Sequence, residues 1–371
     1  MDWSALHIDA EIRRAETLPG SFYASPEVFA RVKAELFPRA WLSIAPEPLP
    51  ATLPAPGELL PFTLSPGLLN EPLLLVHDPA DPELRCLSNV CTHRGMLLHQ
   101  APCSVQRGLR CPYHGRRFGL DGAFRSMPEF QDAQDFPRPA DDLPRLPLGR
   151  LGPLAFTSLS PETSFEDWLG RLPERLSFFP WDELSLDVDG AQTYLVDANW
   201  ALYCENFLEG FHIPYVHPGL AQAVDYSAYT TELFPTGTLQ LGVAQPSELA
   251  FELPADHPDA AQRIAAYYYW LFPATMLNVY PWGVSLNVIE PMSPTQTRVR
   301  FLPYVWRAEL RDQGAGAGLD QVEQEDEAVV EAVQRGVRSR LYTRGRYSPS
   351  RERGVHHFHR LLSQALQGDP A

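Results

Sequence analysis

The sequence predicts an α+β fold, in which a small β-rich domain precedes a larger domain of antiparallel strands and a long helix. From about Trp41 to Pro147, short apolar runs such as PLLLVHD and LRCLSNV are broken by Pro, Gly and Asp, which is typical of a small β domain. Farther on, extended segments are interrupted at residues 281–283 and 291–294, as in hairpins. A long amphipathic helix is predicted from about Leu319 to Tyr342.

The bulk composition restricts the possible function classes. The 371 residues suffice for two or three domains, and the formal charge of −16 argues against nucleic-acid binding, which requires clustered Lys and Arg. No apolar run approaches the roughly 18–20 residues of a membrane span, and the N-terminus shows no apolar signal segment. Five cysteines, an odd number, are unlike a disulfide framework, so we expect a reduced, cytoplasmic protein.

The remaining elements follow along the chain. Residues 25–38 are predicted as a helix that starts at Ser25 as N-cap, with Pro26 in the first helical position. Residues 138–153, RPADDLPRLPLGRLGP, are predicted to connect the two domains. The run TYLVDANW is predicted as a strand that leads into the helix NWALYCENFLEGFH.

Four metal-binding candidates stand in the β-rich region: Cys91, His93, Cys111 and His114. A structural zinc site accepts two cysteines and two histidines. However, zinc sites more often place both cysteines in one arm, whereas here each arm carries one Cys and one His. A [2Fe–2S] centre with two thiolates on one iron and two imidazoles on the other fits that arrangement. Gly95 and Gly115 would let backbone N–H groups approach the cluster sulfides.

A second group lies in ENFLEGFHIPYVHP. Read as one helix, Glu205, Glu209 and His212 lie on one face. Pro214 interrupts that helix, so a kink could bring His217 back toward His212. Two imidazoles and a carboxylate make a 2-His-1-carboxylate iron(II) site. Histidines that are simply hydrogen-bonded at a helix end are the alternative, and the first group of ligands in the same chain favours iron.

The long helix offers several carboxylates for the third ligand position. Its predicted apolar stripe consists of Val322, Val329, Val330, Val333, Val337 and Leu341. Asp326 lies at the centre of this stripe and Glu323 at its margin, whereas Glu325, Glu327 and Glu331 are expected to point away. A carboxylate buried among valines is costly unless it is paired or bound to a metal, which favours Asp326. Glu323 and Glu205 remain the alternatives.

These motifs resemble those of the Rieske non-haem iron oxygenases: CTHRG and CPYHG resemble the cluster motif, and ENFLEGFHIPYVHP resembles the mononuclear iron motif. The resemblance implies that Cys91, His93, Cys111 and His114 bind the [2Fe–2S] cluster and that His212, His217 and Asp326 bind iron. It also implies a homotrimer in which Glu209 bridges the iron to His93 or His114 of a neighbouring subunit.

Three positions refine this resemblance. Met96 stands where respiratory Rieske proteins have a disulfide cysteine, which favours the oxygenase or ferredoxin type. Arg116 stands where the oxygenases commonly have Trp, and we expect it to alter the packing of the cluster but not its ligands. Glu209, where many ring-hydroxylating members have Asp, resembles the branch that acts on quaternary amines.

The resemblance implies three parts: residues 1–40, a helical segment packing on the catalytic domain; residues 41–150, the Rieske domain; and residues 151–371, a helix-grip-like catalytic domain. We therefore predict an oxygenase that uses O₂ and electrons from a separate NAD(P)H-dependent reductase or ferredoxin. Its substrate would be a small aromatic compound or N-methylated amine, mono- or dioxygenated. The alternative is an electron carrier or a zinc-stabilised binding protein without oxygenase chemistry. An electron carrier would have no use for Glu209, His212, His217 and Asp326.

Two further groups of residues are given no role in metal binding. The aromatic residues at 267–270, Phe272, Tyr280 and Trp282 are expected mainly in the core, with some of them lining a substrate pocket. The histidines at 356, 357 and 359 are expected on a helix surface or at a subunit contact.

Overall fold

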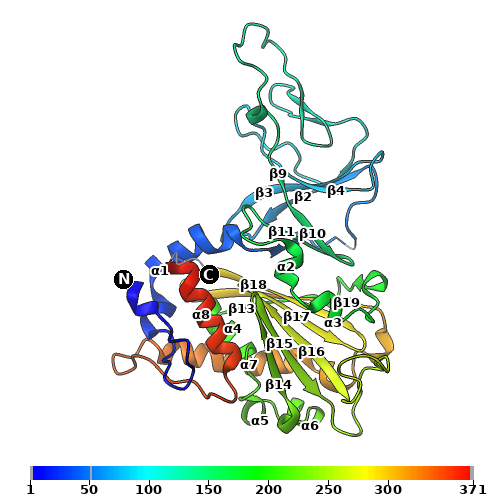
Figure 1. The fold of residues 1–371 in the computed structure, drawn as a ribbon. Helices are drawn as coiled ribbons and strands as arrows, with labels where there is room; N and C mark the ends of the chain where they lie inside the picture. The colour runs from blue at the N-terminus through cyan, green and yellow to red at the C-terminus, as the bar shows by residue number, and fades with distance from the viewer. Residues whose placement is uncertain (1–2, 51, 368–371) are drawn as a thin grey trace. The chain divides into compact units, whose positions relative to one another are not determined.

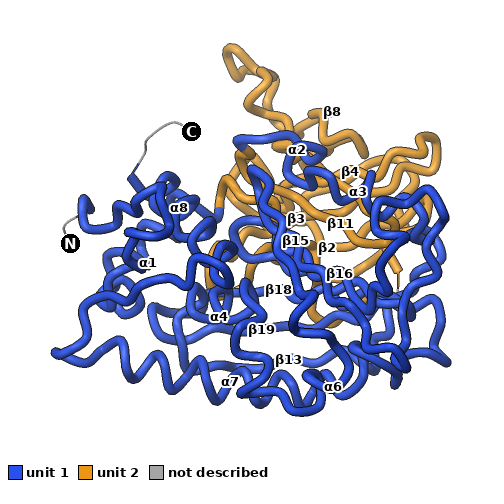
Figure 2. Tube along the Cα trace, turned by 60° about the horizontal axis from the view of Figure 1, so that its bottom comes forward, with its two compact units in different colours: residues 1–37, 162–371 blue, residues 38–161 orange. Residues whose placement is uncertain are grey.

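The structure is a computed structural model that describes residues 3–50 and 52–367 (Figure 1). The chain divides into two compact units, one made of residues 1–37 with 162–371 and the other of residues 38–161 (Figure 2). Within the described ranges, no helix is long and apolar enough to cross a membrane.

The smaller unit consists of three antiparallel sheets. The five-stranded sheet has the order β5 (Cys103–Ser104), β2 (Glu58–Leu64), β3 (Glu71–His77), β4 (Leu84–Ser88) and β9 (Arg145–Leu146). The second contains β6 (Leu109–Arg110), β7 (Arg117–Phe118) and β8 (Phe124–Ser126). The third contains β1 (Leu42–Ser43), β11 (Leu154–Thr157) and β10 (Leu148–Leu151).

Residues 138–153 are therefore not the simple connection that the sequence suggested. They contain a short 3₁₀ turn, Pro139–Asp141, together with β9 and β10. Leu143, Leu146 and Leu151 are buried and hold this segment against the unit's core. Pro139 opens the 3₁₀ turn, and Pro144, Pro147 and Pro153 lie outside the short strands, where a missing N–H donor removes little ladder pairing.

The larger unit is built on one antiparallel sheet. Its strand order is β12 (Ser185–Leu186), β19 (Gln296–Val305), β18 (Gly283–Ser293), β17 (Thr275–Tyr280), β16 (Ile264–Leu271), β15 (Gly237–Val243) and β14 (Thr230–Phe234), and β13 (Gln192–Val196) also pairs with β19. The predicted hairpin breaks are confirmed, since β17 pairs with β18 around residues 281–282 and β18 with β19 around 294–295.

The main helices of this unit are α4 (Trp200–Phe207), α7 (Leu319–Gly336) and α8 (Arg353–Gln367). Helix α4 packs against α7, α8 and β18 (Figure 1). Shorter helices are α2 (Phe165–Leu169), α3 (Leu172–Arg175), α5 (Ile213–Val216) and α6 (Leu220–Ala223). The long helix α7 packs against α4, and α4 packs against the antiparallel sheet at β18. This arrangement agrees with the predicted α+β, helix-grip-like class.

The helix predictions for the C-terminal part of this unit were incomplete. The long helix ends at Gly336 rather than near Tyr342, and α8 was not predicted at all. Helix α8 buries Val355, Phe358, Leu362 and Leu366 at helical spacing, so the periodic signal was present in the sequence. His356 and His359 are buried in α8 instead of lying on a helix surface.

The N-terminal segment groups with the larger unit. Helix α1 (Pro26–Arg31) begins as predicted, because the Ser25 side chain accepts a hydrogen bond from the Val28 N–H at 3.2 Å. The chain continues through a π-helical turn, Val32–Leu36. Backbone hydrogen bonds tie Thr17 to Gly345 and Gly20 to Thr343, which fixes this segment to the stretch that follows α7.

Candidate metal centres and substrate pocket

The first group of ligands lies on two loops with the same backbone pattern. The Cys91 N–H donates to the carbonyl of Met96, and the Cys111 N–H donates to that of Arg116, five residues later in each case. Gly95 and Gly115, with φ of +70° and +75°, each donate back to the carbonyl of their cysteine. A positive φ costs little only for glycine, so the glycine of each motif is explained by this turn.

The four side chains pair by type. Cys91 and Cys111 are buried in one apolar cluster and their thiols interact, while the rings of His93 and His114 lie 4.9 Å apart. Burial raises the pKa of the Cys91 thiol, which the backbone N–H of His93 partly offsets by hydrogen bonding to the sulfur.

The arrangement of these four side chains distinguishes a single zinc ion from a two-iron cluster. A single zinc ion needs four donor atoms around one point. Among the described residues, however, these four do not form a group with all donor atoms within 4.8 Å of one another. The buried Nδ1 of His114 has no hydrogen-bond partner in the described part of the chain, which suits a metal-binding nitrogen. Two cysteines on one side and two histidines on the other fit a two-iron cluster better than one zinc.

Arg116 and Asp141 link both ligand loops. The Arg116 guanidinium is buried and donates to the Asp141 carboxylate at 2.7 Å and to the Asp141 carbonyl at 3.1 Å. The same carbonyl accepts a hydrogen bond from the Thr92 hydroxyl at 2.8 Å, and Thr92 stands between Cys91 and His93. Asp141 therefore holds the first loop through Thr92 and the second through Arg116.

Arg116 also packs among aromatic rings, with its guanidinium carbon 4.9 to 5.6 Å from the ring centres of Phe118, Phe124 and Phe136. Arginine stacks on such rings as Trp can. Where the related motif commonly has Trp, this chain fills the position with a paired arginine.

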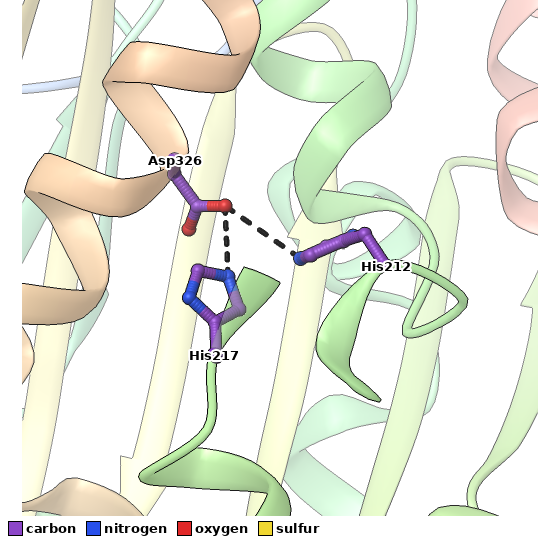
Figure 3. Close-up of side chains that lie close together, drawn as sticks. All are labelled: His212, His217 and Asp326. Atoms are coloured by element: carbon purple, nitrogen blue, oxygen red, sulfur yellow. Dashed lines mark hydrogen bonds and ion pairs between the residues drawn. The ribbon is translucent and has the colours of Figure 1, made fainter. Parts of the chain in front are cut away.

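The second group comes together in the larger unit, as Figure 3 shows. Asp326 Oδ1 lies 3.0 Å from His217 Nε2 and 3.6 Å from His212 Nε2, and the two rings are 5.1 Å apart. Asp326 belongs to α7, His212 to the loop after α4, and His217 to the end of α5. His212, His217 and Asp326 are the one set of three or more potential ligands found clustered in residues 3–50 and 52–367.

Local structure explains how His217 reaches His212, although the predicted continuous helix is wrong. Helix α4 ends at Phe207, so Glu209 and His212 lie on a loop, and the Ile213–Val216 turn carries the chain to His217. Glu205 does not share a face with them. Its carboxylate lies 3.0 Å from His359 Nε2 on α8, away from the His212 and His217 pair.

Two carboxylates orient the imidazole rings of His212 and His217 by contacting the Nδ1 atom of each ring. Glu209 Oε1 lies 2.6 Å from His212 Nδ1, and its Oε2 accepts the backbone N–H groups of Phe211 and His212. Glu325 Oε2 lies 2.7 Å from His217 Nδ1. A carboxylate on the second ring nitrogen fixes the tautomer and leaves Nε2 free to bind metal. Two oriented imidazoles and Asp326 fit an iron(II) centre with open positions.

The valine stripe used to select Asp326 coincides only in part with the buried face of α7 and the residues that follow it. Glu323, Val330, Gln334 and Val337 are buried, whereas Val333 and Leu341 are exposed. The Asp326 side chain is 16% exposed and lies beside the histidines rather than among valines. Glu325 does not point away from the site, as expected, but binds His217. Glu325 contacts the metal site only because α5 places His217 beside it. A helical wheel drawn for α7 alone could not identify this contact.

A pocket of about 730 Å³, including its opening to solvent, adjoins this centre. His212, His217, Asp326 and Glu209 lie on its wall. Its aromatic lining consists of Tyr203, Phe207, Tyr229, Tyr268, Tyr280 and Phe301, and its amide lining of Asn206, Gln240, Asn278 and Asn287. Of the aromatic group expected mainly in the core, Tyr268 and Tyr280 line the pocket, whereas Tyr267, Trp270 and Trp282 are fully buried.

Glu323 is a pocket residue with an unusual environment. Its side chain is buried, Oε2 accepts a hydrogen bond from the Tyr203 hydroxyl at 2.6 Å, and Oε1 is buried with no partner among the described residues. Burial raises the pKa of Glu323 to about 8; the Tyr203 hydrogen bond opposes this rise, while Asp326 and Glu327 add to it.

Two family models match the chain. The one described as "Rieske [2Fe-2S] domain" matches residues 56–137, and the one described as "Ring hydroxylating alpha subunit (catalytic domain)" matches residues 183–368. The first range contains both ligand loops, and the second contains His212, His217 and Asp326.

Similar proteins include the carnitine monooxygenase oxygenase subunit of Escherichia coli K12, which is 30% identical over 96% of each chain. The chloroplastic choline monooxygenase of Spinacia oleracea is 27% identical over 95% of this chain and 79% of that protein. Among solved structures, a quaternary ammonium Rieske monooxygenase in complex with L-carnitine is 25% identical, with a TM-score of 0.73 over 98% of this chain and 99% of the other. Naphthalene 1,2-dioxygenase from Rhodococcus sp. shares the fold, with a TM-score of 0.70 and 20% identity over 95% of each chain.

Proposed function

The chain belongs to the Rieske non-haem iron oxygenases, and from this premise we propose that it monooxygenates a small N-methylated cation. As a member of this family it is the oxygenase component, with a [2Fe–2S] cluster and a mononuclear iron, and it takes electrons from a reductase or ferredoxin partner. The observation that carries the proposed substrate is the pocket beside His212, His217 and Asp326, with six aromatic side chains and no lysine or arginine in its lining. Aromatic faces attract cations and bind quaternary ammonium groups well.

We assign the cluster to Cys91, His93, Cys111 and His114, and the iron to His212, His217 and Asp326. When bound, these groups supply the electrons and the O₂ activation that the reaction needs. The balance is one O₂, two electrons and two protons per turnover: one oxygen atom enters a C–H bond of the substrate and the other leaves as water.

The protein's own residues do the remaining work. Glu209 and Glu325 orient the two imidazoles through their Nδ1 atoms. The aromatic walls exclude water from the substrate and hold its methylated head beside the metal-binding nitrogens. Asp326, which lies beside both His212 and His217, would be the third protein ligand, and a centre with three protein ligands would keep positions open for O₂ and substrate.

We further propose a homotrimer in which Glu209 also meets His93 or His114 of a neighbouring subunit, and an NAD(P)H-dependent reductase as the electron source. Glu209 is supported in this role because it contacts His212 while lying on a loop rather than inside a helix.

A cytoplasmic location is supported by the five cysteines, none of which forms a disulfide.

Anaerobically purified protein tests this proposal by metal analysis, visible and EPR spectra, and O₂ uptake coupled to product. We expect cluster iron and sulfide plus one further iron per chain, and turnover of methylated cations in preference to aromatic hydrocarbons. Iron confined to the cluster would favour an electron carrier, and a colourless zinc protein would favour a binding module. Preferred turnover of neutral aromatic compounds would overturn the substrate class alone.

A further inference from the structure

The metal centre leaves one pocket carboxylate unused. Of the three carboxylates on the pocket wall, Glu209 binds His212 and Asp326 lies between the two histidines. Glu323, one helical turn before Asp326, has only the Tyr203 hydroxyl on Oε2. A buried carboxylate oxygen without a partner is costly, so a structural role for Glu323 would leave that cost unexplained.

No positive side chain compensates Glu323. The lining residues, all in the described part of the chain, include neither lysine nor arginine. The titratable groups that interact with Glu323 are acidic or phenolic: Asp326 and Glu327 on α7, Tyr203 on α4, and Tyr194 on β13. The two histidines of the lining are assigned to the metal. A cationic ligand beside Glu323 favours the ionised form of this carboxyl, so its binding lowers the pKa of Glu323 from the raised value of the free pocket.

Other buried acceptors line the same pocket. Gln240 Oε1 and Asn278 Oδ1 are buried without partners in the described residues. The Gln240 amide is oriented by its Nε2, which donates to the Phe207 carbonyl at 2.7 Å, so its oxygen remains as the free acceptor. A ligand that satisfies these oxygens carries a hydroxyl or N–H donor. A ligand carboxylate placed at this wall would be repelled by the negative charge of an ionised Glu323.

We propose that Glu323 is the specificity residue that neutralises the cationic head of the substrate, and that the pocket selects a methylated amino alcohol over both its uncharged analogue and a carboxylate-bearing betaine. This inference rests on the proposed function, since it names the charge and the second functional group of the same substrate. Tyr203 holds the Glu323 carboxylate in place, and Gln240 and Asn278 receive the substrate hydroxyl.

Calorimetric binding to the anaerobic holoenzyme tests this with three probes: choline, its uncharged carbon analogue 3,3-dimethylbutan-1-ol, and carnitine. At a pH above the raised Glu323 pKa of about 8, we expect wild type to bind choline at least about tenfold more tightly than either other probe, the scale of one desolvated charge contact. Glu323→Gln keeps the shape and the acceptor for Tyr203, and should lose about tenfold or more for choline with little change for the uncharged analogue. Glu327→Gln, on the same helix but outside the pocket lining, is the matched control and should behave as wild type.

Each outcome decides one point. If Glu323→Gln retains the wild-type preference for choline, Glu323 is not the counter-charge, and continued turnover of choline would leave the proposed function intact. If wild type itself shows no preference for choline over the uncharged analogue, the inference fails without reference to any variant. Preferred binding of carnitine overturns the selection against a carboxylate, and turnover of neutral aromatic compounds alone overturns the proposed substrate class as well.

Discussion

The link between Asp141 and both cluster loops leads to a sharp prediction for Asp141→Asn. The substitution keeps the size of the side chain but removes the charge that Arg116 pairs with at 2.7 Å. In one orientation of the new side chain, its NH₂ group replaces the oxygen that accepts the Arg138 N–H at 2.9 Å. In the other orientation, the NH₂ group replaces the oxygen that faces Arg116.

The expected loss is large because the pair is buried. The side chains of Arg116 and Asp141 are only 2% and 12% exposed, and Arg116 Nε already has no partner among the described residues. Removing one member of a buried pair leaves the other charge uncompensated, which costs about 3–5 kcal/mol. Because Asn still accepts one hydrogen bond, we expect the lower end of this range, about 3 kcal/mol.

The assay is denaturant-induced bleaching of the cluster's visible absorbance in the full-length holoprotein, together with far-UV circular dichroism. Asp141→Asn should bleach at clearly lower denaturant than wild type. The control is Asp121→Asn, which removes the exposed Arg125–Asp121 pair of the same unit, with side chains 58% and 45% exposed. Exposed pairs contribute about 0–1 kcal/mol, so this control should match wild type.

The effect also has a defined pH dependence. Burial raises the pKa of Asp141, but hydrogen bonds from Arg116 and from the Arg138 N–H lower it below its ordinary value of 3.8. A lowered carboxyl pKa contributes stability that is complete above pH 3.8 and is lost as pH falls through the folded-state pKa. The difference between Asp141→Asn and wild type should therefore shrink in acid. Equal bleaching midpoints for the two proteins at neutral pH would refute the link.

Three further predictions concern α7. Asp326→Ala should lose the mononuclear iron and keep the cluster spectrum, as measured by metal analysis and EPR; retention of both metals would transfer the ligand role to Glu323 or Glu205. Glu325→Ala should weaken Fe(II) binding by about 10- to 100-fold by freeing the His217 ring, and unchanged Fe(II) affinity in a titration would rule out this positioning role. Burial raises the pKa of Glu323 to about 8. In the unfolded chain this carboxyl ionises from pH 4.5 upward. In the folded chain, where Asp326, Glu327, Tyr194 and Tyr203 surround it, the carboxyl keeps its proton to about pH 8. Stability therefore falls across this window, and Glu323→Gln in chelator-stripped protein should gain thermal stability relative to wild type from pH 5 to pH 8; parallel curves would contradict this.

The sequence alone determined those features that depend on local spacing. The two cluster loops were predictable because each places Cys, His and Gly within five residues, and the turn at Gly95 and Gly115 follows from those residues. Extended segments and hairpin breaks likewise predicted the antiparallel strands of the larger unit, since both are properties of short stretches. The expectation of an oxygenase with a Rieske cluster and a mononuclear iron was confirmed by the family models.

Tertiary structure decided which carboxylates serve the second centre. Asp326, Glu325 and Glu323 stand within four residues on α7, and their separate environments arise from α5, α4 and the pocket. A helical wheel assumes one buried side, whereas α7 faces two histidines and a tyrosine that are more than a hundred residues away in sequence. The end of α4 at Phe207 and the buried histidines of α8 were missed for the same reason, because partners distant in sequence outweigh local propensity.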